Sequence, residues 1–184
     1  MTLHPGLERR IATLLRRPVH SPENREVRAV VRLRGRDACE YCLLPTTSMF
    51  HVEHIVPPAL WADYVADRLA GVPPQPDRGG PDHIDNYAWS CPFCNGRKKD
   101  RVALGSGRGA TRFFDPRYDR WPDHFVFLPG SEYLLIEGVS PEGKATEIGL
   151  GVNMGGTEGP LGTRHVRIVK GEYPPPWARA AYGI

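Results

Sequence analysis

The sequence carries Cys39-Glu40-Tyr41-Cys42, then His51-Val52-Glu53-His54-Ile55-Val56-Pro57, then Gly79-Gly80-Pro81-Asp82-His83-Ile84-Asp85-Asn86, and finally Cys91-Pro92-Phe93-Cys94-Asn95-Gly96-Arg97-Lys98. All four cysteines, Cys39, Cys42, Cys91 and Cys94, belong to the two Cys-x-x-Cys pairs. Two intervening residues allow both sulfurs of a tight turn to reach one tetrahedral ion. Two disulfides are the alternative, but this paired spacing in a chain that looks cytosolic favours zinc. We therefore expect one structural Zn²⁺ site bound by all four cysteines.

The composition bounds the class of protein. The chain has 184 residues, of which 40% are hydrophobic, and a net charge of +3. This length fits one domain, or a small motif with added flanks. The sequence contains no run of about 18 apolar residues that would predict a membrane span. It also has no N-terminal apolar stretch resembling a signal peptide, so we expect a cytoplasmic protein. The mildly basic charge is compatible with a nucleic-acid partner without requiring one.

Hydrophobic periodicity predicts an N-terminal helical flank over residues 1–36. Helices are expected over about 6–16 and 22–35, the second with Ser21 as N-cap and Pro22 at its first position. Four arginines of the flank are interpreted as a solvated face in preference to a DNA contact: Arg9, Arg10, Arg16 and Arg17.

The central segment, residues 37–104, is expected to hold the core around the cysteines. A strand is predicted over 50–56, where apolar and polar residues alternate. An insertion over 58–78 contains an amphipathic helix, 58–71, which we interpret as a cap on the core. A further helix is expected over 94–104, so the core combines strands and helices.

A C-terminal extension over residues 110–184 is expected to pack on this core. Strand-like runs at 125–128 and 133–139 precede a helix over 144–153, and the fold class is therefore predicted to be α+β. The last thirty residues are rich in Gly and Pro, and their order is left open. Three residues are interpreted as a packed cluster that holds the extension, with a DNA contact as the alternative: Arg117, Trp121 and His124.

The Glu53-His54 pair suggests hydrolysis of a phosphodiester. This reaction needs an activated water, neutralised charge at phosphorus and a stabilised leaving oxygen. A neutral His54 could accept a proton near neutral pH as general base. Glu53 would hold a divalent ion on the phosphate. His51 is left open between a further metal ligand and a surface histidine, and His83 is placed in a turn.

Asn95 follows Cys94 at an expected helix start, and its amide oxygen is a hard ligand suited to Mg²⁺. A helix N-cap is the alternative for Asn95. Asn86 is expected to tie the intervening loop and to orient His54 through the backbone. Four basic residues beside the helix start are candidates for phosphate contacts, with a solvated surface as the alternative for Lys98: Arg97, Lys98, Lys99 and Arg101.

The pattern Cys-x-x-Cys, Val-Glu-His-Ile-Val-Pro, Gly-Gly-x-Asp-x-x-x-Asn and Cys-x-x-Cys-Asn-x-x-Lys resembles the HNH endonuclease family. The resemblance covers about residues 27–104. It implies a ββα-metal (His-Me finger) core, two antiparallel strands and a helix around one catalytic ion, stapled by a four-Cys zinc site. It matches Glu53 to the metal-binding acid, His54 to the general base and Asn86 to the central Asn. Asn95 stands at the last position, where many members carry His. The 58–78 insertion is longer than usual.

The segment after residue 113 is similar to the tail of a group of small stand-alone bacterial HNH proteins, in Phe114-Asp115-Pro116-Arg117, Trp121-Pro122-Asp123-His124-Phe125 and Gly143-Lys144-Ala145-Thr146. We therefore expect a DNA endonuclease that uses Mg²⁺ or Mn²⁺ and leaves a 5′ phosphate and a 3′ hydroxyl. The alternative is a zinc-stapled nucleic-acid-binding module without cleavage. Target, oligomeric state (a homodimer included) and biological context are left open.

Overall fold

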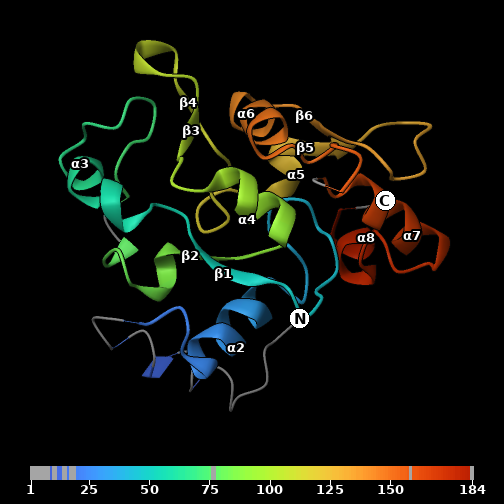
Figure 1. Cartoon of the computed structure of the whole chain (residues 1–184), viewed down its shortest axis with the longest axis horizontal. Coiled ribbons are helices and arrows are strands. Elements are labelled where there is room, and N and C mark those ends of the chain that lie inside the picture. The colour runs from blue at the N-terminus through green and yellow to red at the C-terminus, as the bar shows by residue number, and fades with distance from the viewer. Residues whose placement is uncertain are drawn as a thin grey trace.

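The computed structural model describes residues 9, 12–13, 16, 20–75, 78–157 and 159–182 (Figure 1). These residues form helices and three two-stranded antiparallel sheets, which confirms the predicted α+β class. The elements are α2 (Arg25–Arg34), β1 (His51–His54), η1 (Pro58–Leu60), α3 (Trp61–Val65), η3 (Ile84–Asn86), β2 (Tyr87–Ser90), α4 (Pro92–Lys98), β3 (Ala103–Leu104), η4 (Gly107–Gly109), β4 (Thr111–Arg112), α5 (Trp121–His124), β5 (Phe125–Phe127), β6 (Ile136–Gly138), α6 (Pro141–Leu150), α7 (Leu161–Val169) and α8 (Pro176–Tyr182).

The pair β1–β2, followed directly by α4, forms the centre of the molecule. The strands are antiparallel, with Glu53 opposite Ala88 and His54 opposite Tyr87. All of β2 is buried, whereas β1 has an exposed His51 and a buried Glu53. Helix α4 contacts β1, and α2 contacts both strands. In the view of Figure 1, α2 lies below the strand pair and α4 above it. Residues 51–54 are therefore held between two helices.

Helix α2 begins later than predicted. Its N-cap is Asn24, whose Oδ1 accepts hydrogen bonds from Glu26 N at 2.8 Å and Val27 N at 3.3 Å. The prediction of Ser21 as N-cap is wrong, because Asn24 is an equally good capping residue and lies one turn closer to the buried apolar residues of the helix. The hydrophobic periodicity that predicted this helix is confirmed, since three apolar residues on one side of α2 are buried: Val27, Val30 and Val31. The helix predicted over 6–16 lies largely outside the described residues.

Helix α4 is shorter than predicted. It ends at Lys98, and Lys99 takes a left-handed conformation with φ of 49°. The chain leaves the helix because residues 103–104 pair with 111–112 in the β3–β4 hairpin. The expected helix over 94–104 was therefore wrong in its C-terminal half.

The predicted helix over 58–71 is found only in part, as the short η1 and α3, because Asp67 adopts a positive φ of 53° and the helix does not continue. Tyr64 is buried and packs with Val56 and Val72 in a small second hydrophobic cluster. At the end of the insertion, Arg78 is buried, and its guanidinium donates to the Tyr64 hydroxyl at 3.1 Å. The insertion thus caps the segment that follows β1.

The C-terminal extension shares the main core. One buried cluster runs from α2 through the cysteines and β2 to α6 and α8. Helix α6 begins after Ser140, which caps it, so the helix predicted over 144–153 forms about three residues earlier. The Gly- and Pro-rich end contains two helices, α7 and α8, both seen at the edge of the molecule in Figure 1. Among the described helices, none combines the length and apolar character needed to cross a membrane.

Candidate functional site

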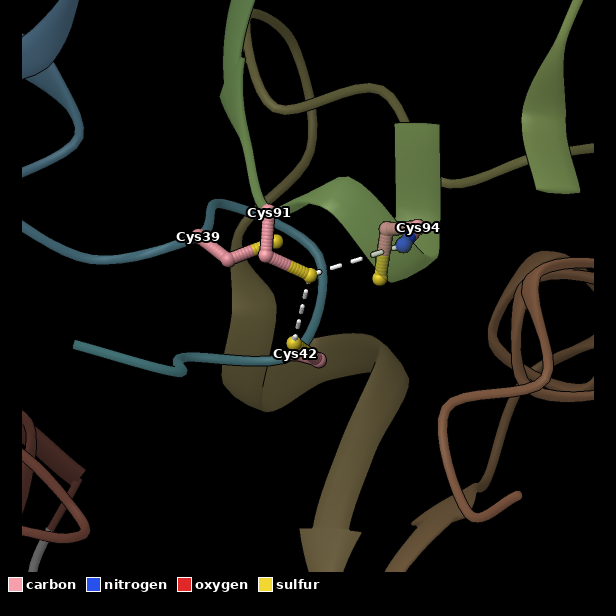
Figure 2. A group of neighbouring side chains, drawn as sticks. All are labelled: Cys39, Cys42, Cys91 and Cys94. Carbon is pink, nitrogen blue, oxygen red and sulfur yellow. Dashed lines mark hydrogen bonds between the residues drawn. The ribbon is translucent and has the colours of Figure 1, made fainter. Parts of the chain in front are cut away.

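The four cysteines converge on one point in the core. Figure 2 shows their sulfurs close together. Cys39 and Cys42 come from the loop before β1, Cys91 directly follows β2, and Cys94 lies in α4. All four are buried, and their sulfurs lie within 4.8 Å of one another. A tetrahedral zinc with Zn–S bonds of about 2.3 Å places its sulfurs about 3.8 Å apart, and the Cys42 and Cys91 sulfurs are 3.8 Å apart. The cluster can therefore hold a metal ion such as zinc.

Four buried sulfur atoms close together are a donor set that suits Zn²⁺. Burial raises the pKa of the Cys91 thiol, because a buried thiolate without a nearby cation is poorly solvated. A bound Zn²⁺ compensates the thiolate charge directly. None of the four is in a disulfide, so the alternative pairing into two disulfides is not the arrangement found.

The C-terminal extension holds the first Cys-x-x-Cys turn by its backbone. Trp121 Nε1 donates to the Tyr41 carbonyl at 3.2 Å, and the Tyr173 hydroxyl donates to the Cys42 carbonyl at 3.0 Å. Arg117 forms a buried ion pair with Glu40. These contacts confirm the interpretation of Arg117 and Trp121 as packing residues. His124 joins them through a hydrogen bond between its Nδ1 and the hydroxyl of Ser140 at 2.6 Å.

Three residues predicted to act together, Glu53, His54 and Asn95, line one surface pocket of about 430 Å³. The remaining residues of this pocket are Val52, Pro57, Pro58, Gly96, Lys99 and Asp100. Strand β1 supplies Glu53 and His54, and the first turns of α4 supply Asn95. The cysteine cluster fixes the start of α4, since Cys91 caps it and Cys94 lies within it. The position of Asn95 therefore depends on the cluster.

Glu53 is buried at 5% exposure, and both of its carboxylate oxygens have partners. Its Oε2 accepts a hydrogen bond from the Tyr41 hydroxyl at 2.7 Å, and its Oε1 lies 2.5 Å from Lys98 Nζ. Burial raises the pKa of Glu53, although the Lys98 ammonium acts in the opposite direction. The carboxylate nevertheless belongs to the pocket wall, and a carboxylate with an amide oxygen is a donor set that suits Mg²⁺ or Mn²⁺.

His54 has a partner that the sequence did not identify. Its Nε2 lies 3.0 Å from Asp82 Oδ1, and its ring meets the edge of Tyr87 at 4.9 Å between centroids. Because a carboxylate accepts but does not donate, this contact places the imidazole proton on Nε2 and leaves Nδ1 to accept a proton. The signal was present in Gly79-Gly80-Pro81-Asp82, which brings a carboxylate into the loop facing β1.

Asn86 ties this loop to the chain that follows β1. It is fully buried, and its Oδ1 accepts a hydrogen bond from Val56 N at 2.9 Å. Its Nδ2 donates to the carbonyls of Val56 at 2.7 Å and Pro81 at 2.8 Å. Asn86 does not line the pocket. Asn86 therefore ties the loop to the chain after β1, as predicted. Its predicted effect on the orientation of His54 stays a prediction.

The basic residues after Cys94 divide into two groups. Arg97, Lys99 and Arg101 line an open groove of about 980 Å³ together with Met49, Phe93, Pro92, Gly96 and Thr157. Lys98 points the other way and is 1% exposed. Its prediction as a surface phosphate contact was wrong, because α4 turns this position onto β1, where its ammonium meets Glu53.

Neither His51 nor His83 lines the pocket. His51 is exposed on β1 and is absent from the pocket wall, so the option of a further ligand at the Glu53 site has no geometric support. His83 caps η3, where its Nδ1 accepts a hydrogen bond from Asp85 N at 3.3 Å. His83 is therefore in the turn where it was expected.

Apart from the four cysteines, the described residues contain no group of three or more His, Cys, Asp or Glu side chains placed to share an ion. Comparisons of the chain with protein-family models, with curated proteins and with solved structures found no match. A function is therefore inferred from the residues of this chain and their geometry.

Proposed function

We propose that this chain is a metal-dependent DNA endonuclease of the HNH type, with a ββα-metal core. The observation that carries the proposal is the single pocket lined by Glu53, His54 and Asn95. The succession of two antiparallel strands and a helix, β1, β2 and α4, matches the order that the HNH resemblance implies. The adjacent four-cysteine cluster, which would hold zinc for structure only, supports the same proposal.

His54 is the general base of the proposed reaction. Asp82 holds its Nε2–H, so Nδ1 takes the proton from the attacking water. A neighbouring carboxylate also stabilises the imidazolium that forms. The proton of the attacking water therefore has a defined acceptor, His54 Nδ1, and the imidazole ring has a fixed orientation.

Glu53 and Asn95 are the residues that would hold the catalytic Mg²⁺ or Mn²⁺. Such an ion supplies charge neutralisation at the phosphate and at the leaving oxygen. The residues of the chain fit this role in type, one carboxylate and one amide on the same pocket wall. Lys99 is exposed at the rim of that wall and also lines the basic groove, so one DNA strand can cross both.

The test is nicking of supercoiled plasmid in Mg²⁺ or Mn²⁺ by wild type, His54→Ala and His51→Ala. His51 is a matched control, because it lies on the same strand but is exposed and outside the pocket. We expect loss of nicking in His54→Ala alone, by about 100-fold or more. Equal activity of His54→Ala and wild type would refute the assignment.

A second candidate is a zinc-stapled DNA-binding module that does not cleave. The observation that favours it is the ion pair between Lys98 and Glu53, which leaves the only carboxylate predicted to bind the catalytic ion already neutralised. Metal content separates the two candidates. The binding module takes up one zinc per chain and no second divalent ion that depends on Glu53.

A further inference from the structure

Lys98 is one of the most deeply buried side chains of the described chain, at 1% exposure. A lysine is rarely found in such a place unless its charge is paired. Here the ammonium lies 2.5 Å from Glu53 Oε1 and donates to the carbonyl oxygen of His54 at 2.8 Å. The charge is therefore compensated by the two residues at the centre of the candidate site.

The atoms around this ammonium are those of a cation site. A carboxylate oxygen and a backbone carbonyl oxygen are hard donors, the type that Mg²⁺ and Mn²⁺ also select. The other oxygen of Glu53 accepts from Tyr41, whose hydroxyl cannot neutralise the carboxylate charge. A divalent ion bound to Glu53, together with the Lys98 ammonium, would place two cations with three positive charges on one carboxylate. At such short separations, inside the protein, that repulsion is strong.

We propose that Lys98 is the resident cation of this site and competes with the catalytic divalent ion for Glu53. The inference rests on the proposed function, because it takes Glu53 as the ligand of that ion. Binding of the ion then requires the ammonium to leave Glu53 and move toward the pocket. The free energy needed to break the ion pair reduces the net free energy of metal binding. The wild-type protein therefore binds the divalent ion weakly. Without the ion, the same pair keeps the buried carboxylate in place.

The matched comparison is Lys98→Met against Lys99→Met. Methionine retains much of the lysine side-chain volume and removes the charge. Lys99 carries the same charge as Lys98 and lines the pocket that contains Glu53, but it is exposed and makes no ion pair with Glu53. A general electrostatic effect on the ion would appear in both variants. Competition for the carboxylate would appear in Lys98→Met alone.

The experiment measures Mn²⁺ binding by the electron paramagnetic resonance signal of free Mn²⁺, with each protein first confirmed to carry one zinc per chain. We expect Lys98→Met to bind Mn²⁺ at least about tenfold more tightly than wild type, and Lys99→Met to change binding by less than about threefold. Glu53→Gln should abolish the Lys98-dependent gain. Unchanged or weaker binding in Lys98→Met would overturn the inference.

Lys98→Met can also lose stability, because it leaves a buried carboxylate without its cation. A measurement on the wild-type protein covers that case. Lysines are acetylated with an amine-reactive reagent and located by mass spectrometry, with and without saturating Mn²⁺. Lys98 should be protected without the ion and modified with it, whereas Lys99 should be modified in both. Protection of Lys98 at saturating Mn²⁺ would contradict displacement.

These outcomes separate the inference from the proposed function. Glu53-dependent Mn²⁺ binding that Lys98→Met does not tighten leaves the nuclease assignment standing and removes the competition. Absence of any Glu53-dependent Mn²⁺ binding in wild type and in Lys98→Met removes both.

Discussion

Asn86 offers the sharpest test of how the candidate site is held together. Its side chain makes three hydrogen bonds of 2.7 to 2.9 Å, to both backbone groups of Val56 and to the carbonyl of Pro81, and its Oδ1 accepts a longer one from Arg78 at 3.5 Å. Val56 follows His54 by two residues, and Pro81 precedes Asp82. The amide of Asn86 therefore joins the two segments that carry the His54–Asp82 contact. The substitution Asn86→Ala removes all three bonds at once.

The expected loss of stability follows from these contacts. A buried polar group left without its partner costs about 1–3 kcal/mol, and a typical net hydrogen bond contributes about 1 kcal/mol. Taking the lower value for each of the three bonds gives a loss of about 3 kcal/mol for Asn86→Ala. With an m-value of about 2 kcal/mol/M, the midpoint of urea unfolding falls by about 1.5 M.

The assay is urea unfolding followed by circular dichroism at a fixed zinc concentration, with Asn95→Ala as the matched control. Asn95 is half-buried in the pocket wall, and its side chain makes no hydrogen bond with another described residue. We expect Asn95→Ala to change the free energy of unfolding by less than about 0.5 kcal/mol while reducing nicking. A loss below about 1 kcal/mol in Asn86→Ala would refute its role as the loop tie.

Three further predictions concern the cluster, the base and the groove. Removal of zinc by a chelator, or Cys94→Ser, should lower the thermal unfolding temperature strongly, because a metal bound to the four cysteines would be part of the core. An unchanged temperature contradicts a structural metal. Asp82→Asn should slow nicking by about tenfold or more at unchanged DNA affinity, because His54 loses its fixed tautomer; a wild-type rate contradicts this. Lys99→Gln should reduce the salt dependence of DNA binding, measured by fluorescence anisotropy, by about one phosphate contact. Lys144→Gln is the control, because Lys144 is exposed on α6 outside the groove, and this variant should leave the salt dependence unchanged.

The cysteine cluster could be predicted from the sequence because its geometry is largely local. Each Cys-x-x-Cys pair is a single tight turn, and the only long-range contact to be predicted was the one between the two turns. The register of β1 against β2 supplies that pairing, because β1 follows the first turn and β2 leads into the second. The positions of Glu53, His54 and Asn95 follow from the same two turns. Their convergence on one pocket was therefore within reach of sequence reasoning.

The partners of these residues were not within reach. Lys98 stands in a run of basic residues, which predicted a surface position, and its true partner Glu53 is 45 positions earlier in the chain. The side of α4 that faces β1 depends on how the helix packs on the strand, and the sequence pattern did not reveal that packing. Asp82 reaches His54 through a loop whose path depends on Asn86 and the insertion. Pairings across irregular loops leave no periodic signal.

Tyr41 connects three parts of the molecule that are distant in the sequence: the cysteine cluster, the C-terminal extension and the candidate site. It lies between the first two cysteines, its carbonyl accepts a hydrogen bond from Trp121 of the C-terminal extension, and its hydroxyl donates to Glu53. Burial raises the pKa of the Tyr41 hydroxyl well above its usual value, so it remains a donor across the physiological pH range. The cysteine cluster fixes the backbone of this turn, and the extension fixes its carbonyl. The cysteine cluster and the extension together therefore set where the Tyr41 hydroxyl points. Through this hydroxyl they also set the orientation of the Glu53 carboxylate, for which Lys98 and a divalent ion would compete.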